Sequence, residues 1–286
     1  MNMTMEGRSI SIHGYKTFYH DAGEGNKETI LFLHGSGVGV SAMGNWRFAL
    51  PFFSQTYRCI APDLLGFHKS EHPAEPPKGG RAWMDLWVRQ VVGLMDELGL
   101  DKVHLVGNSM GGAISKNLLW KHPERFNRVV LMGTAGLVSK PTDSLSRAWG
   151  FYNNPSKEEL LWLIRNFVTD PTILGDDLNS IVAARFESAM EPDVRRSYES
   201  MFYGGAQRVI HEISVPEEAY AKMHHKILIA HGKEDVYVPA ANSVSLMNFL
   251  PDAQLHLFSH CGHWIQIEKQ TAFHHLVYHF FKGHLD

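Results

Sequence analysis

The sequence predicts an α/β fold with a mostly parallel, doubly wound sheet and a helical insertion. Short runs of branched and aromatic residues alternate with helix-like stretches along most of the chain, as they do when helices cover both faces of a sheet. The alternation stops between about residues 138 and 215, where only helix-like segments occur. With 286 residues, 44% of them hydrophobic, the chain is long enough for a large continuous core. We therefore expect an α/β core of residues 1–137 and 216–286 and a helical lid of residues 138–215.

The predicted elements follow one another regularly. The runs Ser9–His13 and Tyr15–Tyr19 alternate around Gly14 like an antiparallel hairpin. Buried parallel strands are expected at Thr29–Leu33, Tyr57–Ala61, Val103–Val106, Arg128–Met132, Lys226–Ala230 and Gln254–Phe258. Helices are expected at Arg81–Leu98, Gly112–Lys121, Ala240–Leu250 and Thr271–Phe281.

The predicted insertion is rich in aromatic side chains. It holds helix-like segments at Ser156–Val168 and Ile181–Met190, and its aromatic residues are Trp149, Phe151, Tyr152, Trp162, Phe167, Phe186, Phe202 and Tyr203. Such a segment either folds over the strand ends as a lid or buries its aromatic rings only in a core of its own. If it is a lid, these rings and Met190 favour an apolar pocket beneath it.

Composition excludes several classes of partner. The net charge of −3 argues against a nucleic-acid ligand and leaves a small molecule as the expected partner. No apolar stretch is long enough to span a membrane, and Met1–Glu6 lacks the basic start and apolar run of a leader, so we expect a cytoplasmic protein. Cys59 and Cys261 form no disulfide framework.

No metal or other cofactor is expected. His275 and His279 are spaced four residues apart, with His274 alongside, but no HExxH glutamate accompanies them. We expect these histidines on a solvated or partly packed C-terminal helix.

The segment Gly107–Gly111, Gly-Asn-Ser-Met-Gly, lies between a predicted strand and a predicted helix. That setting is typical of a nucleophile elbow, in which a serine hydroxyl projects from a sharp turn at the tip of a sheet. Ser109 is therefore the predicted nucleophile. The pentapeptide alone is common by chance, and the strand and helix around it carry the prediction.

A serine hydroxyl needs a histidine base, and the histidine needs a carboxylate that fixes its tautomer. In this fold both follow later strands, in the order serine, acid, histidine. Asp235 follows the strand predicted at Lys226–Ala230, and His263 follows the strand predicted at Gln254–Phe258. The nearest rivals are Glu234, Asp252 and His260. We expect Glu234 to point elsewhere, Asp252 to lie at the wrong end of the sheet, and His260 to have a surface or supporting role.

Backbone donors for an oxyanion are expected from the glycine-rich turn at His34–Gly39 and from the residue after the nucleophile. Ser36 and Met110 are the two predicted donors, and Gly37 is a third candidate. A phosphate-binding interpretation of the turn fails because no lysine follows at the P-loop position and the spacing matches no dinucleotide fingerprint.

With these residues in place, the chain resembles the α/β-hydrolases, and among them the meta-cleavage product hydrolases of bacterial aromatic degradation. The resemblance covers nearly the whole chain. Its specific points are His34–Gly37 leading to Asn45 and Trp46, Asn108 before the serine, Gly133–Gly136 after the next strand, and Trp264 after the histidine.

The resemblance implies an enzyme that splits the carbon–carbon bond of a 2-hydroxy-6-oxo-hexa-2,4-dienoate into 2-hydroxypentadienoate and a carboxylic acid, without a cofactor. It implies that Asn45, Asn108, Arg185 and Trp264 line the polar half of the pocket, and that the chain forms a homodimer or a larger homo-oligomer. The alternative function is that of a serine carboxylesterase of the same fold.

The residues by themselves leave other roles open for these four side chains. Asn45 and Asn108 would also suit a helix cap and a cap of the elbow turn, Arg185 a solvent-facing position, and Trp264 plain packing. Two positions depart from the family pattern: Val38 stands where proline is common, and His68 where glycine is usual. His68 is therefore expected at a site that requires positive φ.

Overall fold

The described residues, 6–175 and 178–286 of a computed structural model, form one eight-stranded sheet with the strand order β1-β2-β4-β3-β5-β6-β7-β8. The strands are β1 (Glu6–Ile12), β2 (Tyr15–Ala22), β3 (Thr29–Leu33), β4 (Arg58–Pro62), β5 (Val103–Asn108), β6 (Phe126–Met132), β7 (Ile227–Gly232) and β8 (Ala253–Phe258). β2 pairs antiparallel with β1 and β4, and the other neighbours pair in parallel. The predicted mostly parallel α/β fold is confirmed.

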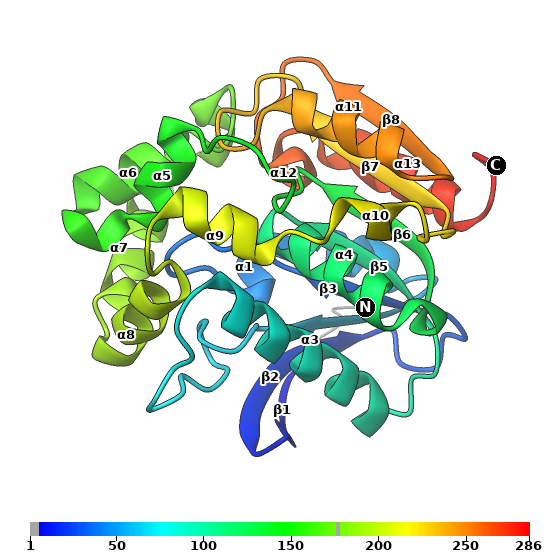
Figure 1. Cartoon of the computed structure of the whole chain (residues 1–286), viewed down its shortest axis with the longest axis horizontal. Coiled ribbons are helices and arrows are strands. Elements are labelled where there is room, and N and C mark those ends of the chain that lie inside the picture. The colour runs from blue at the N-terminus through cyan, green and yellow to red at the C-terminus, as the bar shows by residue number, and fades with distance from the viewer. Residues whose placement is uncertain (1–5, 176–177) are drawn as a thin grey trace.

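Helices cover both faces of this sheet (Figure 1). The helices of the described residues are α1 (Ala42–Trp46), α2 (Ala49–Phe53), α3 (Gly80–Glu97), α4 (Met110–Lys121), α5 (Asp143–Trp149), α6 (Lys157–Arg165), α7 (Leu178–Ala189), α8 (Pro192–Met201), α9 (Ala206–Ile213), α10 (Glu217–Tyr220), α11 (Ala240–Phe249), α12 (Ile265–Glu268) and α13 (Gln270–Phe281).

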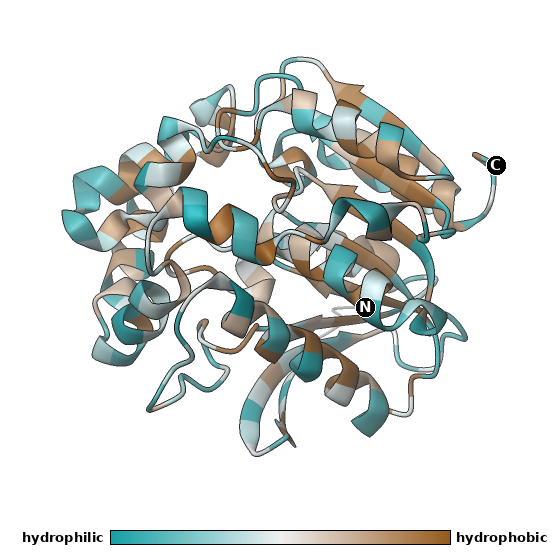
Figure 2. Cartoon of the chain, viewed as in Figure 1, coloured by the Kyte–Doolittle hydropathy of each residue, from teal (hydrophilic) through white to brown (hydrophobic). Residues whose placement is uncertain are grey.

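Alternate residues of the central strands enter two separate cores. In β3, Leu31 and Leu33 pack into the core beneath α3, α4 and α11, whereas Ile30 and Phe32 pack into the core beneath α1, α2 and α13. Successive side chains of a strand point to opposite faces, so a sheet covered on both sides needs apolar residues at every position. The central strands are accordingly hydrophobic along their length, while the outward faces of the helices are polar (Figure 2).

β8 departs from its prediction. It is parallel to β7 as expected, but only Phe258 of its six residues is buried. Because β8 is the last strand of the sheet, it has a neighbour on one side only, and its position in the strand order cannot be read from its composition.

Between β6 and β7 the described residues contain helices and no strand. Helices α5 to α8 gather at one end of the molecule, beyond the carboxyl ends of the parallel strands, and α9 leads the chain back along the face that carries α3 (Figure 1). The boundaries 138 and 215 and the division into core and lid stay predictions.

His68 has a φ of +46°, so the requirement for positive φ expected at this position is confirmed. No helix among the described residues has the length and hydropathy needed to cross a membrane. Residues 1–5, on which the expectation of no leader partly rests, lie outside the described residues.

Candidate active site

Ser109 sits on a strained turn between β5 and α4. Its φ and ψ are 54° and −112°, a backbone conformation that L-residues rarely adopt and that is typical of a nucleophile elbow. The turn depends on Gly111, because a side-chain carbon there would overlap the carbonyl of Leu33 on the neighbouring strand. The amide of Ser109 donates to the carbonyl of Met132, 2.9 Å away, which ties the elbow to β6.

Asp235 and His263 meet through one short hydrogen bond. The Nδ1 atom of His263 lies 2.6 Å from Oδ2 of Asp235, and both side chains are buried. The other carboxylate oxygen, Oδ1, accepts the amides of Tyr237 and Val238 at 2.8 and 3.0 Å. Burial acts to raise the pKa of Asp235, but the charges and hydrogen bonds of His263 and His231 outweigh it and hold the pKa well below its usual range. The carboxylate is therefore ionised and fixes Nδ1 of His263 as a donor.

His231 is a second histidine on the same carboxylate, and it was not predicted. Its Nε2 lies 3.1 Å from Oδ2 of Asp235 and 2.9 Å from the carbonyl of Val238, while its Nδ1 lies 2.6 Å from the hydroxyl of Ser243. Nε2 of His231 thus donates to Asp235 and Val238, while Nδ1 bonds to a hydroxyl that can either donate or accept. The available signal in the sequence was a histidine near the end of a buried strand, four residues before the acid.

The rival residues lie elsewhere. His260 and Asp252 are exposed, and Asp252 precedes β8, at the opposite end of the strand from His263. Glu234 is also exposed, and its Oε2 accepts the amide of Cys261 at 3.0 Å. Glu268 accepts the amide of Gly262 at 2.6 Å. Glu234 and Glu268 thus hold the loop that carries His263 rather than bonding to its imidazole.

One cavity joins most of the predicted site residues. Its polar lining consists of Ser36, Asn45, Asn108, Ser109, Arg185 and His263. Its apolar lining includes Val40, Leu145, Ala148, Trp149, Phe167, Tyr237 and Trp264. Gly37 also borders this space, whereas Asp235 and Met110 do not. Asp235 instead bonds to His263, which lines the cavity.

The predicted oxyanion donors lie on two segments near Ser109. Among the described residues, no backbone hydrogen bond uses the amide of Ser36, Gly37 or Met110. Met110 is the first residue of α4, where amides have no acceptor within the helix and the helix dipole is positive. The hydroxyl of Ser36 accepts from Nε1 of Trp149 at 3.0 Å, which fixes the side chain and leaves its own O–H able to donate. Both the backbone amide and the hydroxyl of Ser36 are therefore available as donors.

Arg185 reaches from α7 to the glycine-rich turn. Its Nε and Nη2 atoms donate to the carbonyl of Val38 at 3.2 and 2.8 Å. A guanidinium carries five N–H groups, so three remain, and no ion pair links Arg185 to any described carboxylate. Burial lowers the pKa of Arg185 to about 10, which still leaves it cationic at neutral pH. The side chain therefore offers an unneutralised positive charge to the cavity rather than facing solvent.

The two asparagines do not act as caps. Asn45 lies inside α1, whose cap is Ser41; its Oδ1 accepts the amide of Gly35 at 3.1 Å, and its buried Nδ2 has no partner in the described residues. Asn108 ends β5 and donates from Nδ2 to the carbonyl of Met132 at 3.3 Å. Asn45 thus brings a buried, unsatisfied donor to the cavity wall, an arrangement that a bound acceptor would complete.

Phe167 was not singled out from the other aromatic residues of the insertion. Its ring stacks on Trp264 and on Tyr237, with centroids 4.4 Å apart in each case, and lies 5.7 Å from the imidazole of His263. The packing role left open for Trp264 is therefore real, although Trp264 also lines the cavity. The suggestion that Met190 contributes to an apolar pocket is wrong, because this side chain is exposed at the end of α7 and borders no part of the cavity.

Comparison with known proteins decides the family. The alpha/beta hydrolase fold family matches residues 28–270. The chain is 39% identical to the 2-hydroxymuconate semialdehyde hydrolase of Pseudomonas sp. strain CF600, over 95% of this chain and 92% of the relative. It superposes with a TM-score of 0.89 on the meta-cleavage product hydrolase of Pseudomonas fluorescens IP01, at 37% identity and with 97% and 98% of the two chains covered. The chain belongs to the meta-cleavage product hydrolases.

A serine hydrolase from the polyaromatic-hydrocarbon-degrading bacterium Cycloclasticus zankles is also similar, with a TM-score of 0.96, 44% identity and 98% and 99% of the chains covered. Membership in this family makes the chain a serine hydrolase that acts on carbon–carbon bonds of meta-cleavage products.

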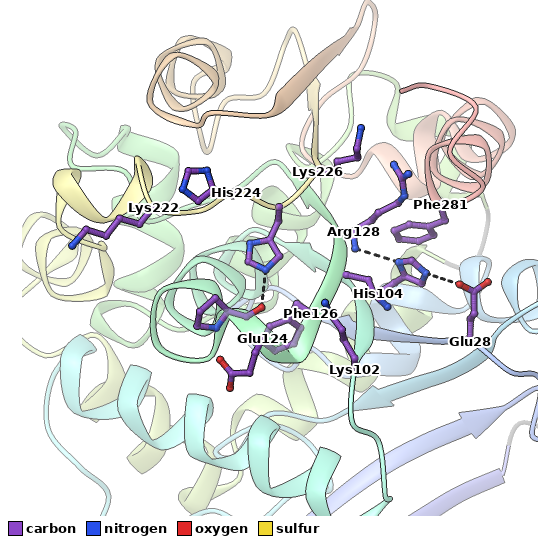
Figure 3. A pocket seen from close by; sticks show the side chains of 13 residues that line it. Glu28, Lys102, His104, Glu124, Phe126, Arg128, Lys222, His224, Lys226 and Phe281 are labelled. Carbon is purple, nitrogen blue, oxygen red and sulfur yellow. Dashed lines mark hydrogen bonds and ion pairs between the residues drawn. The ribbon is translucent and has the colours of Figure 1, made fainter.

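A second groove lies far from this hydrolase site. It opens at the amino ends of β5, β6 and β7 and is lined by charged and imidazole side chains such as Lys102, His104, Arg128 and Lys226 (Figure 3). In open α/β sheets, ligands bind at the carboxyl ends of the strands, where Ser109 and His263 lie. Arg128 and Lys226 are also partly neutralised by Asp286. The groove is therefore not the active site.

The three C-terminal histidines differ in burial, since His275 and His279 are exposed on α13. His274 is buried and stacks on Phe52 with centroids 4.9 Å apart. Within residues 6–175 and 178–286, no three His, Cys, Asp or Glu side chains are grouped so as to hold a metal ion.

Proposed function

We propose that the cavity hydrolyses the carbon–carbon bond of a 2-hydroxy-6-oxo-hexa-2,4-dienoate, with Ser109, His263 and Asp235 as the catalytic residues. The observation that carries this proposal is the uncompensated Arg185 guanidinium, which shares one cavity with Ser109 and His263. An ester need not carry a negative charge, whereas a dienoate always has a carboxylate. The arginine therefore favours the dienoate over the alternative, a serine carboxylesterase.

Arg185 and Asn45 are the proposed partners of the anionic end of the substrate. A guanidinium pairs with a carboxylate through two parallel hydrogen bonds, and the free N–H groups of Arg185 supply them. The unpartnered Nδ2 of Asn45 adds a donor for a carboxylate, hydroxyl or keto oxygen. Asn108 and Trp264 complete the proposed binding surface.

The reaction has two steps. First, the 2-hydroxyl group loses its proton and C5 gains one, with His263 placed to move them, so that the dienol becomes a keto form. Second, an oxygen nucleophile adds to the C6 ketone and the C5–C6 bond breaks. Its electron pair moves into the conjugated keto group, which accepts it as an enolate. Protonation gives 2-hydroxypentadienoate. If Ser109 is the nucleophile, C6 stays on the serine as an acyl ester, which a water activated by His263 then hydrolyses to the carboxylic acid. If the nucleophile is a water on which Ser109 and His263 act together, the carboxylic acid forms directly.

The negative charge that develops on the C6 oxygen needs fixed donors. The amides of Met110, Ser36 and Gly37 are the proposed oxyanion hole, since they lie beside the elbow without other acceptors. Contacts from the insertion hold this turn: Trp149 donates to the Ser36 hydroxyl, Tyr198 to the Ser36 carbonyl at 3.1 Å, and Arg185 to Val38. The insertion therefore acts as a lid that also supports the oxyanion hole.

The apolar half of the cavity would receive the group attached to the ketone. The side chains of Leu145, Ala148, Trp149 and Phe167 make this region suitable for an aryl or bulky alkyl group. The relative from strain CF600 is a hydrolase of 2-hydroxymuconate semialdehyde, in which the corresponding carbonyl is an aldehyde.

The purified chain is expected to remove the visible absorbance of dienoates and to release 2-hydroxypentadienoate. Initial rates on dienoates with a hydrogen, methyl or phenyl group on C6 are compared with the rate on p-nitrophenyl butyrate. We expect kcat/KM for the preferred dienoate to exceed that for the ester by at least about 10²-fold, because only the dienoate engages Arg185. Faster turnover of the ester than of every dienoate would favour the carboxylesterase alternative.

Arg185→Met is expected to lower kcat/KM for a dienoate by about 10²-fold, because a buried charge-assisted pair with the substrate carboxylate is lost. Turnover of p-nitrophenyl butyrate, which has no carboxylate, is expected to change by less than about threefold. The matched control is Arg195→Met on α8, whose guanidinium is exposed and pairs with Glu199. An equal loss on both substrates would mean that Arg185 acts by holding Val38 and not by binding the carboxylate.

We also propose that the chain works in the cytoplasm and forms a homodimer or a larger homo-oligomer. The small-molecule substrate and the two unpaired cysteines, both buried, are consistent with a reducing compartment. Sedimentation of the purified chain at several concentrations tests the oligomeric state.

A further inference from the structure

Two consecutive polar side chains of α4, Lys116 and Asn117, are completely buried, although they have no part in the reaction. The Nζ atom of Lys116 donates to the carbonyls of Ala135 and Gly136, at 2.7 Å each. No described carboxylate pairs with Lys116. A buried lysine without an acid is costly, because its charge loses hydration without a compensating ion pair. The location of the two carbonyls that it binds indicates what role offsets this cost.

These carbonyls belong to the segment through which the chain leaves the sheet after β6 and enters the insertion. The amide of Ala135 donates to the carbonyl of Ser109 at 3.1 Å, so this segment touches the elbow. At Gly133 an added Cβ would lie 3.2 Å from the imidazole of His263. The hydroxyl of Tyr220 also donates to Gly136, at 3.3 Å. Lys116 thus fixes a segment that borders both the nucleophile and the histidine.

Asn117 binds the segment through which the chain returns. Its Nδ2 donates to the carbonyl of Ile213 at 2.9 Å, and its Oδ1 accepts from Nη1 of Arg81 at 3.0 Å. Nη2 of Arg81 then donates to the carbonyl of Ser214 at 2.8 Å. The two ends of the insertion therefore lie against adjacent residues of one helix, the helix that begins at the nucleophile.

We propose that Lys116 and Asn117 are positioning residues that clasp both ends of the insertion to the nucleophile helix and so set where Arg185, Trp149 and Phe167 stand relative to Ser109. Neither residue touches the cavity. Lys116 binds carbonyls in the irregular segment after β6, and Asn117 binds the carbonyl of Ile213, the last residue of α9, where the helix supplies no further amide. Apolar residues of the same size would fill the space but leave these carbonyls unsatisfied.

The hydrogen bonds from Lys116 to the carbonyls of Ala135 and Gly136 persist on both sides of neutral pH. Burial lowers the pKa of the Lys116 ammonium to about 7, so both the charged and the neutral amine are populated near that pH. The charged form has three N–H groups and the neutral form has two, so either form has enough donors for the two carbonyls. The ring of Tyr220, 5.9 Å from Nζ, faces the same amine. No other ionisable side chain among the described residues is found within bonding distance of it.

Lys116→Met is the decisive variant, since it keeps the length of the side chain and removes every donor. We expect KM for a dienoate to rise by about tenfold while kcat falls by less than about threefold, because the lid residues that bind substrate lose their position and the elbow does not. Lys116→Arg, which retains donors, is expected to restore KM at least in part. This expectation rests on the proposed function.

Hydrogen–deuterium exchange gives a readout that does not depend on the substrate. In Lys116→Met, the amides of α5, α7 and α9 are expected to exchange at least about tenfold faster, with the amides of β5 unchanged. Asn117→Ser tests the return segment if Lys116→Met does not fold. The matched control is Ser115→Ala, because Ser115 is equally buried on α4 but its hydroxyl bonds within the helix, to Gly111 at 2.7 Å.

Uniformly faster exchange across the whole chain with an unchanged KM would mean that Lys116 only stabilises the fold, and it would overturn the proposal. Unchanged exchange in the insertion would also overturn it. If the wild-type chain hydrolyses no dienoate, the proposed function fails. The exchange experiment still decides whether Lys116 and Asn117 hold the ends of the insertion in place.

Discussion

Asp235→Asn is expected to lower kcat by about 10⁴-fold on every substrate of this hydrolase. Oδ2 of Asp235 accepts from Nδ1 of His263, and Oδ1 accepts two backbone amides. An asparagine keeps its oxygen toward the amides and turns its NH₂ group toward the histidine. Nδ1 must then become the acceptor, which moves the ring proton to Nε2 and leaves the imidazole unable to take a proton on the cavity side. Steady-state kinetics on a dienoate measures the loss.

His231 increases the effect of this substitution. Its Nε2 also lies against Oδ2, so the new NH₂ group would face two ring nitrogens that both donate in the wild type. We therefore expect Asp235→Asn to lower the melting temperature as well, which circular dichroism measures separately from kcat. The control is Glu234→Gln, an adjacent exposed carboxylate whose substitute still accepts from Cys261. If Glu234→Gln lost as much activity as Asp235→Asn, Asp235 would not be the acid.

The chemistry at the strand ends could be predicted because chain order and topology restrict it. In a parallel sheet, loops after successive strands meet at one edge, so a serine after β5, an acid after β7 and a histidine after β8 are brought together by connectivity alone. His260, close enough in sequence to be a rival, is exposed and does not line the cavity. Asn45 lines the cavity together with Ser109, and the cap role left open for it does not apply because Ser41 caps α1.

Contacts to backbone carbonyls could not be predicted from the sequence. Lys116 would suit the exposed face of an amphipathic helix as well as the interior, and its partners are main-chain atoms of Ala135 and Gly136 that no residue type encodes. Phe167 presented the same difficulty in another form. Its place between Trp264 and Tyr237 depends on how the insertion folds onto the core. The sequence does not distinguish Phe167 from the other aromatic residues of the insertion.

Ser109→Ala is expected to lower the rate of carbon–carbon cleavage by at least about 10³-fold, and losses near 10⁶-fold are known for serine nucleophiles that act with a histidine. The variant should fold as the wild type does. Within the described residues, the hydrogen bonds of Ser109 all involve its backbone, and alanine meets the positive φ of the elbow at a similar cost. The exposed Ser259, four residues before His263, provides the control substitution Ser259→Ala.

The same variant separates the two steps of the reaction. His263 and Asp235 remain intact in Ser109→Ala, so proton transfer from the 2-hydroxyl group to C5 should continue while bond cleavage stops. Stopped-flow absorbance should therefore show the dienolate band disappearing without release of 2-hydroxypentadienoate, which chromatography measures in the same samples. Persistence of the dienolate would mean that Ser109 takes part in the proton transfer too, and product release at the wild-type rate would remove Ser109 from the catalytic residues. Both the acyl-enzyme route and the water route require the hydroxyl of Ser109, so we expect the keto form to accumulate in either case. Detection of this keto form would show that the serine acts in the second step.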